Sequence, residues 1–318
     1  MAALPADRVQ AAFPFQVSGV DYCGPFYLTQ KVRDRAPIKG YISLFICFST
    51  KAIHMELVPD LTTNAFIAAL RRFISRRGRC STIYSDNATN FIGANKELKV
   101  MLQDFLSEEH SSALREACQQ EGITWAFIPP RSPHFGGLWE SGVKQAKHYL
   151  RRAIGKYILT YDELNTVICQ TEAILNSRPL TPLSSDPNDL RPLTPAHFLI
   201  GRPLAALPEP NLCTINPASL KSYKLIQWIQ QQFWERWRKE YLNCLQQKTK
   251  WTVTSPNIQV NDLVLLKDGN IPPLRWPLAR VIAVNPGDDG FVRVATVKSN
   301  EGVFKRAITK LCKLPLEQ

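Results

Sequence analysis

Short apolar runs separated by polar turns fill the first part of the chain. Three of them follow one another closely, a spacing typical of antiparallel strands joined as a meander. They cover residues 15–28, 40–48 and 52–58. The next segment, residues 61–77, has its apolar side chains at helical spacing and ends before Gly78. We therefore predict three antiparallel strands followed by a helix.

Helix and strand patterns then alternate as far as residue 176. Two further strands are predicted at residues 82–85 and 123–128. The helices predicted around them cover residues 94–106, 107–120, 138–154 and 161–176. Residues 129–137 (PPRSPHFGG) are expected to form a loop, because their prolines and glycines interrupt both helices and strands. This order predicts an α/β fold with a mixed sheet and flanking helices.

The last part of the chain changes character twice. Residues 178–210 are rich in proline and leucine, and we expect an extended segment that lies on a surface. Residues 216–250 have apolar side chains at helical spacing, and the aromatic group at residues 228–237 is interpreted as core packing. Four short runs after Pro256 are separated by turns such as NPGDDG, which predicts a small β-barrel. These runs cover residues 259–267, 278–284, 290–296 and 303–308.

Three carboxylates stand at the borders of predicted elements. Asp21 follows the run 15–20, Asp86 follows the strand 82–85, and Glu140 lies near the start of a helix. Each has a simpler explanation alone, as a turn residue, a helix cap or a partner of a helix dipole. Together they can converge on one crevice, where they would repel one another unless a cation bound them. Mg²⁺ is the cation that hard oxygen ligands favour, and this arrangement predicts two-metal phosphodiester chemistry.

The residues around these acids resemble the catalytic core of retroviral and retrotransposon integrases. The segments that carry the resemblance are VDYCGPF, YSDNATNF, IPPRSPHFGGLWE and RPLTPLSSDPNDLRPLTPAHFLIGRPL, and they are most similar to integrases of BEL/Pao LTR retrotransposons. The resemblance extends from about residue 4 to the C-terminus. Retroviral integrases follow a D,D-35-E pattern, whereas 53 residues separate Asp86 from Glu140 here. We interpret residues 93–121 as an insertion before the last strand of the core.

The resemblance implies an RNase H-like core, a helical connector and an SH3-like β-barrel, which we place at residues 8–203, 204–255 and 256–318. It implies a polynucleotidyl transferase that trims the 3′ ends of the element's DNA and joins them to target DNA. Its expected partners are double-stranded DNA and further copies of the chain. The nucleus is its expected location.

By the same resemblance, Asp21, Asp86 and Glu140 are the expected catalytic residues and metal ligands. Two Mg²⁺ or Mn²⁺ ions are implied, one held by Asp21 with Asp86 and the other by Asp21 with Glu140. No protein nucleophile is then needed, because water or a DNA 3′-hydroxyl attacks the phosphodiester.

A basic face follows Glu140 along the predicted helix. Lys144, Lys147 and Arg151 lie four, seven and eleven residues after it and therefore share its side of the helix. A solvated basic surface would explain them, but cations beside an acidic crevice are also what would hold DNA phosphates. Lysines occupy the matching offsets in retroviral integrases, so we predict that these three residues contact DNA.

Three polar residues near the acids are possible supporting groups. Asn87 and Asn90 either shape the turn after the fourth strand or position a phosphate or a metal-bound water. His134 in the predicted loop either approaches the DNA or a metal-bound water, or does neither.

Composition narrows the function classes further. The net charge of +12 and the sequence pI near 9.4 favour a polyanionic partner. The apolar run at residues 41–48 is too short to span a bilayer, and the first residues lack a secretory signal pattern. The eight cysteines show no paired spacing, so reduced, mostly buried thiols are expected. Because no histidine precedes His54, the zinc module of integrases is missing, no zinc is expected, and the chain is interpreted as truncated or as a segment of a polyprotein.

Two other functions fit parts of this pattern. A domesticated integrase that binds nucleic acid without catalysis would explain the missing zinc module, although the three acids argue against it. A ribonuclease H shares the fold and the metals. The glycine-rich loop, the basic helix after Glu140 and the basic barrel favour the integrase.

Overall fold

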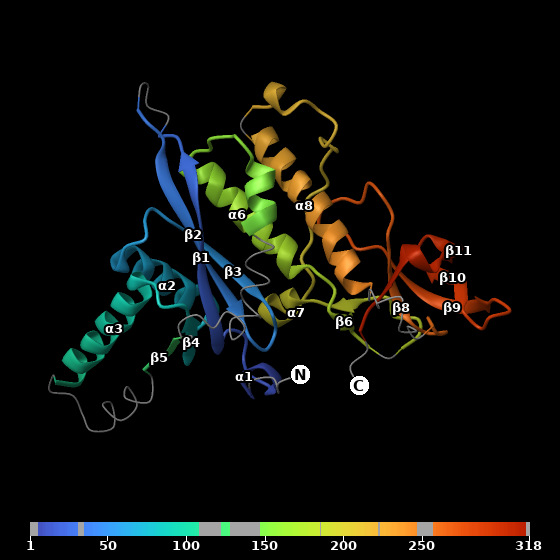
Figure 1. Cartoon of the computed structure of the whole chain (residues 1–318), viewed down its shortest axis with the longest axis horizontal. Helices are drawn as coiled ribbons and strands as arrows, with labels where there is room; N and C mark the ends of the chain where they lie inside the picture. Colours follow the sequence, from blue (N-terminus) through green and yellow to red (C-terminus); the bar gives the residue numbers. More distant parts are fainter. Residues whose placement is uncertain are drawn as a thin grey trace. The chain divides into compact units, whose positions relative to one another are not determined.

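The structure is a computed structural model that describes residues 6–30, 35–107, 122–127, 147–184, 186–221, 223–246 and 257–315. The chain forms two compact units, Met1–Glu172 and Ala173–Gln318, each with its own main sheet (Figure 1). The finer division at residues 203 and 255 stays a prediction. Among the helices of the described ranges, none combines the length and the apolar character needed to cross a membrane.

A mixed five-stranded sheet forms the centre of the first unit, in the order β3-β2-β1-β4-β5. Its strands are β1 (Val17–Leu28), β2 (Ile38–Cys47), β3 (Ile53–Val58), β4 (Thr82–Ser85) and β5 (Thr124–Phe127). The first three form the predicted antiparallel meander, and β4 and β5 join it in parallel. This order is that of an RNase H-like sheet, so the predicted fold class is confirmed.

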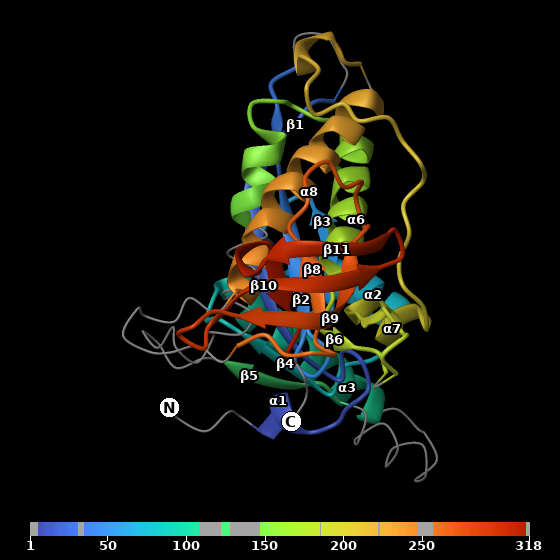
Figure 2. The same ribbon diagram turned by 90° about the vertical axis from the view of Figure 1, so that its right-hand side faces the viewer.

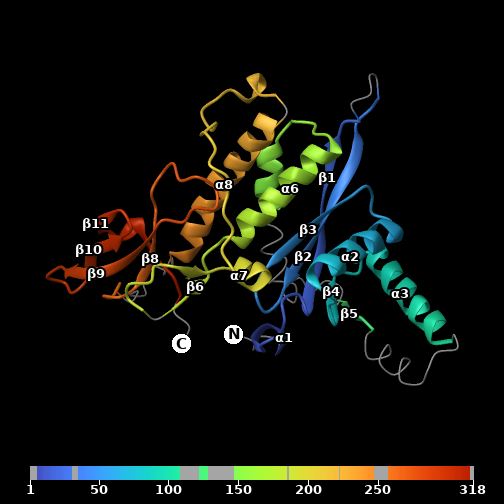
Figure 3. The same ribbon diagram turned by 180° about the vertical axis from the view of Figure 1, so that it is seen from behind.

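Helices α2 (Thr63–Arg77) and α3 (Thr89–Ser107) lie side by side on one face of this sheet (Figures 1 and 3). The hydroxyl of Thr62 accepts the N–H of Ala65 at 3.2 Å and caps α2. Gly78 ends it with a φ of +89°, a conformation that favours glycine. The buried face of α2 packs its aromatic rings on β2, where Phe73 stacks on Phe45 with centroids 4.2 Å apart.

Several predicted boundaries shift. Helix α3 begins at Thr89, earlier than the predicted residue 94, because a side chain in the preceding turn organises its start. The unit also contains the short helix α1 (Ala6–Val9) and the start of α6 (Tyr161–Asn176). Of the helix predicted at 138–154, residues 147–154 are described and are helical. The helix predicted beyond residue 107 and the loop at 129–137 lie outside the described residues.

The second unit contains the small β-domain. Strands β8 (Leu263–Leu266), β9 (Leu278–Pro286), β10 (Val292–Ser299), β11 (Gly302–Ala307) and β12 (Leu311–Lys313) form an antiparallel sheet in the order β11-β10-β9-β8-β12 (Figure 2). One of its faces buries a compact apolar cluster that includes Val264, Val281 and Val297. The predicted β-domain is confirmed, with β12 added. That strand was missed because three residues are too few to show a period.

Helix α8 (Tyr223–Leu245) supplies the aromatic part of this unit. Trp234 and Trp237 are buried, and both lie edge-on to Trp276, with centroids 4.9 and 5.9 Å away. The indole N–H of Trp234 donates to the carbonyl of Ile271 at 2.7 Å. The interpretation of this segment as core is therefore confirmed for these two tryptophans.

The expectation of a wholly extended segment at residues 178–210 is wrong. It contains a short bridge between β6 (Thr181–Pro182) and β7 (Pro192–Leu193), followed by helix α7 (Pro195–Ile200). The Nδ1 atom of His197 accepts the backbone N–H of Thr194 at 3.1 Å, and Gly201 ends the helix at a φ of +71°. The sequence did contain the signals, a threonine cap, a proline in the first turn and a closing glycine.

The described cysteines are free thiols, as expected. Cys23, Cys47, Cys80 and Cys312 are buried, so most of the described thiols are covered as expected, whereas Cys169 and Cys244 are exposed. Burial raises the pKa of Cys23 to about 11 and that of Cys80 to about 12, so both remain protonated at neutral pH.

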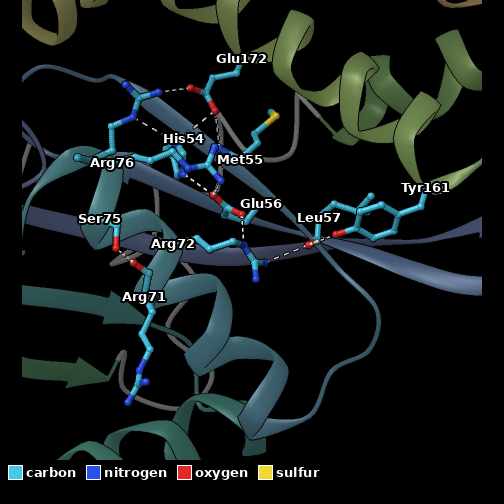
Figure 4. Close-up of polar contacts among 11 residues, drawn as sticks. His54, Met55, Glu56, Leu57, Arg71, Arg72, Ser75, Arg76, Tyr161 and Glu172 are labelled. Carbon is cyan, nitrogen blue, oxygen red and sulfur yellow. Dashed lines mark hydrogen bonds and ion pairs between the residues drawn. The ribbon is translucent and has the colours of Figure 1, made fainter.

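The buried carboxylate of Glu56 on β3 contacts cationic side chains from β3 and α2 (Figure 4). Its Oε1 lies 2.8 Å from Nε2 of His54 and 2.6 Å from the guanidinium of Arg76, and its Oε2 accepts Nε–H of Arg72 at 2.7 Å. Burial by itself would raise the pKa of this carboxyl, but the bonds from His54 and Arg72 hold it below its usual value.

The imidazole of His54 has a second carboxylate neighbour, Glu172 on α6. Its Nδ1 accepts Nε–H of Arg77 at 3.2 Å and lies 3.3 Å from Oε2 of Glu172, which also accepts the N–H of Met55 at 2.8 Å. A neutral ring keeps the bond from Arg77, whereas a protonated ring donates to Glu172. Burial opposes protonation, but Glu172 and Glu56 outweigh it and raise the pKa of His54 above its ordinary value.

This cluster predicts a pH-dependent loss on Glu56→Gln. Removing one partner of a buried charge group costs about 3–5 kcal/mol, and the exposed ends of Arg72 and Arg76 reduce the expected loss to about 2–3 kcal/mol. The contribution of Glu56 is present above its ordinary pKa of 4.5 and is lost as the pH falls through the lowered value. That of His54 is present below its ordinary pKa of 6.5 and is lost as the pH rises through the raised value.

The difference in the free energy of unfolding between wild type and Glu56→Gln should therefore be largest between these two ordinary values. Urea denaturation over a pH series measures it, and Glu97→Gln on the exposed surface of α3 is the control. A pH-independent difference would contradict the assigned network.

Candidate active site

The parallel pairing of β1 with β4 brings two of the predicted acids to one level of the sheet. The paired residues are Val17 with Thr82, Ser18 with Ile83 and Gly19 with Tyr84. Asp21 and Asp86 each lie two residues beyond the last pair. Because adjacent strands are about 4.8 Å apart, both side chains start from neighbouring backbone positions.

Asp21 lies within its strand, as the predicted strand 15–28 has it, and not at the border of the run 15–20. It lies inside β1, where it is paired with Leu44 of β2, and β2 continues to pair with β1 as far as Leu28. Only the pairing on the β4 side stops at Gly19. Among the described residues, no strand therefore pairs with β1 on the β4 side at Asp21.

The carboxylate of Asp21 is held by two donors. Its Oδ1 accepts the backbone N–H of Tyr22 at 2.6 Å, and its Oδ2 lies 2.8 Å from Nζ of Lys147. Both side chains of this ion pair are 28% exposed. Asp21 therefore already has an ammonium partner in Lys147.

Asp86 lies in the turn between β4 and α3. Its Oδ1 accepts the N–H of Ala88 at 3.1 Å, which organises the start of the helix. Its carbonyl accepts the hydroxyl of Ser85 at 2.8 Å, and that hydroxyl oxygen accepts the indole N–H of Trp125 on β5 at 2.9 Å. The turn is therefore fixed to the end of the sheet, and the carboxylate remains exposed to a ligand.

Tyr22, which the sequence did not single out, joins the two acidic segments. Its ring stacks on Phe91 at 5.3 Å and lies edge-on to Phe66 at 6.2 Å. Phe91 belongs to the first turn of α3, shortly after Asp86, so the residue that follows Asp21 packs on the helix that follows Asp86. Burial raises the pKa of the Tyr22 phenol above its usual range, an effect that the side chain of Asn90 opposes.

The two asparagines have different surroundings. Asn90 is only 6% exposed and lies in this aromatic contact, which favours a role in positioning the turn. Asn87 is exposed beside Asp86. In the sequence, an aromatic residue directly follows both Asp21 and Asn90. Nothing in the spacing, however, indicated that the rings of Tyr22 and Phe91 would be in contact.

The basic helix approaches β1 through two of its predicted cations. Lys147 contacts Asp21, and the guanidinium of Arg151 donates to the carbonyl of Gly24. Both cations therefore face the same strand, as their spacing predicted. Glu140, Lys144 and His134 lie outside the described residues, so their positions relative to Asp21 and Asp86 stay predictions.

Asp21 and Asp86 suit a hard divalent cation. Both offer carboxylate oxygens, which Mg²⁺ prefers, and a carboxylate has about four lone-pair sites, of which Asp21 uses two. Within the described ranges, no group of three or more His, Cys, Asp and Glu side chains could hold a metal ion. The described residues thus supply two of the three predicted ligands, with the ammonium of Lys147 on one of them.

Comparisons with known proteins give distant likenesses. A family of unknown function, DUF5641, matches residues 221–314. A chain of the cryo-EM structure of a simian T-cell lymphotropic virus intasome with the PP2A regulatory subunit B56 gamma matches at 13% identity and a TM-score of 0.40, covering 100% of this chain and 85% of that one. No match was found among curated proteins.

Two structures of the HTLV-2 integrase catalytic core domain in complex with magnesium also match, both at 16% identity. The trimeric form has a TM-score of 0.35 and covers 60% of this chain and 99% of that chain. The dimeric form has a TM-score of 0.32 and covers 52% and 90%. Such likenesses are too distant to assign a function.

The ion pair at Asp21 predicts competition between an ammonium and a metal ion. Lys147→Met removes the charge while keeping the length of the side chain, so Mg²⁺ should bind more tightly and raise the melting temperature more than in wild type. A partly exposed ion pair contributes about 1 kcal/mol, which corresponds to about a fivefold gain in metal affinity. Thermal unfolding across a Mg²⁺ series measures it. Lys96→Met on the exposed side of α3 is the control, and equal gains in both variants would contradict the competition.

Proposed function

We propose that this chain is a DNA integrase of the BEL/Pao retrotransposon type. It would process the 3′ ends of the element's DNA and transfer them into target DNA in a metal-dependent reaction. The observation that carries the proposal is the shared level of Asp21 and Asp86 across the parallel strands β1 and β4. The sequence motifs around Asp21, Asp86 and Glu140 support it, as does the RNase H-like strand order.

In this proposal Asp21, Asp86 and Glu140 hold two Mg²⁺ ions. When bound, such ions stabilise negative charge on the attacking and leaving oxygens of a phosphodiester. The residues of the chain position the acids. The strand pairing sets the level of Asp21, the Ser85 and Ala88 contacts set the turn of Asp86, and the stack of Tyr22 on Phe91 joins the two segments.

The reaction itself needs no nucleophile from the chain. In end processing, a water oxygen bonds to phosphorus and the P–O3′ bond of the element strand breaks. The element keeps a free 3′-hydroxyl, the departing segment carries the 5′-phosphate, and the excess proton of the water passes to solvent. In joining, the element's 3′-hydroxyl oxygen bonds to a target phosphorus, the target strand's P–O3′ bond breaks, and the hydroxyl proton passes to solvent. Lys144, Lys147 and Arg151 would hold the DNA phosphates, copies of the chain would assemble around the DNA, and the nucleus would be the location.

One observation favours the second candidate, a nucleic-acid-binding protein without catalysis. The ammonium of Lys147 already contacts Asp21 and relieves part of the repulsion at this carboxylate without a metal ion. A strand-transfer assay with Mg²⁺ and the element's own terminal DNA separates the two. Joined products support the integrase, and DNA binding without joined products supports the silent protein.

Substitution of the acids tests the catalytic assignment. Asp21→Asn, Asp86→Asn and Glu140→Gln each remove a ligand charge and should each lower strand transfer by about 100-fold or more, since losing one charge-stabilising group costs about 10²–10³ in rate. Circular dichroism and DNA affinity should stay close to wild type. Glu97→Gln on α3 is the matched control. Any of the three variants with near-normal joining would remove that residue from the site.

Removal of the basic side chains tests DNA contact separately from chemistry. The variant Lys144→Ala with Lys147→Ala should bind terminal DNA more weakly and with a smaller salt dependence. Two lost phosphate contacts reduce the slope of log affinity against log salt by about 2. Fluorescence anisotropy over a salt series measures this slope. Lys96→Ala with Lys99→Ala, exposed on α3, is the matched pair. An unchanged slope would leave a solvated basic face as the explanation.

A further inference from the structure

A groove of about 420 Å³ lies beside the last residues of β1. It begins four residues beyond Asp21 on the same strand. The residues of its lining that matter here are Phe26, Tyr27, Arg151, Ile154, Lys156 and Ile158. At about 3.3 Å per residue, the start of the groove is about 13 Å from Asp21 along the strand.

The groove exists because the basic helix ends beside β1 and the chain turns back along it. The N–H of Gly155 bonds the carbonyl of Arg151 at 2.9 Å, and a φ of +58° lets this glycine reverse the chain. The chain then meets β1 again, where the N–H of Thr29 donates to the carbonyl of Leu159 at 2.9 Å. Figure 3 shows the green segment after residue 147 beside the far end of β1. The groove is the space left between the turn and the strand.

Its lining combines three kinds of surface. Phe26 and Ile154 are buried and form an apolar floor. Tyr27 and Ile158 stand on the rim and are 54% and 48% exposed. Arg151 and Lys156 are exposed cations, and the described residues that line the groove include no carboxylate. Cations next to an exposed aromatic ring fit a ligand that carries both phosphates and flat bases.

Simpler explanations cover only part of this surface. A cation in the last turn of a helix is stabilised by the helix dipole, which is enough for Arg151. Lys156 lies beyond Gly155 and outside that turn. A single exposed tyrosine is ordinary on a protein surface. Neither explanation accounts for the fact that Tyr27 of β1 and Lys156 of the turn line one groove, which begins on the same strand as Asp21.

We propose that this groove binds an unpaired end of the DNA strand that passes the Asp21–Asp86 site. Tyr27 stacks on a base, and Lys156 and Arg151 contact phosphates. The span of about 13 Å corresponds to about four nucleotides at 3.4 Å each. The inference rests on the proposed function, because it requires DNA at the site. Beyond the proposed function, the inference specifies the path of the DNA strand along β1 and states that part of this strand is unpaired.

The experiment compares terminal DNA carrying an unpaired end with a blunt duplex of the same length. Both are bound to protein in an Asp86→Asn background, so that no cleavage intervenes. Tyr27→Ala should lower affinity for the unpaired end by about fivefold or more, the effect of losing one stacked base. The blunt duplex should be affected less. Tyr27→Phe keeps the ring and should restore binding. A 5-iodouracil placed about four nucleotides from the reacting phosphate should cross-link to Tyr27 under ultraviolet light.

Tyr161→Ala, at another exposed tyrosine of the same unit, is the matched control for Tyr27→Ala. Lys156→Ala removes one proposed phosphate contact, and Lys96→Ala is its matched control. Thermal unfolding of every variant excludes loss of folding as the cause. Equal losses in groove and control variants, or a cross-link elsewhere in the chain, would overturn the groove while strand transfer by wild type still supported the integrase. Failure of wild type to bind either DNA would overturn both.

Discussion

The candidate site depends on the parallel pairing of β1 with β4. The two acids are separated by 64 residues along the chain, and only this register brings them to the same level. A shift of one residue would turn one of the two side chains to the opposite face of the sheet, because side chains alternate along a strand. The stacking of Tyr22 on Phe91 adds a second connection, because it joins β1 to the start of α3. The geometry of the acids is therefore a property of the sheet and its packing.

Charge is the second constraint on this site. Two carboxylates on neighbouring strands repel one another, and Lys147 relieves part of that repulsion at Asp21. Two acids of the same unit that are less exposed have a different set of partners. Glu56 and Glu172 are neutralised by three arginines and a histidine in a nearly closed network. Asp21 has one partly exposed lysine, and Asp86 has a backbone N–H in an exposed turn. The carboxylates of the network thus have more cationic partners than Asp21 and Asp86 have.

Much of the fold follows from local patterns in the sequence. The meander, α2 with its threonine cap and closing glycine, and the small β-domain all have a periodicity or a turn signal that reveals them. The errors have physical reasons. Helix α7 was missed because prolines surround it, and β12 is too short to show a period. Asp21 and Asp86 could be identified from the sequence because each is an acidic residue that follows a short apolar run. The ion pair of Asp21 with Lys147 could not, because it joins residues 126 positions apart and has no local signal.

That ion pair and the groove involve the same helix and the turn at Gly155 that follows it. The helix contacts β1 at Asp21 and Gly24, and after Gly155 the chain pairs with the strand again at Leu28 and Leu159. These segments bring one cation to Asp21, a second to Gly24 and a third, Lys156, to the groove. Positive charge therefore follows β1 away from the acids in one direction. A polyanion whose reacting phosphate lay between Asp21 and Asp86 would gain these contacts only by running along β1, so the strand that carries the first acid would also set the path of the ligand.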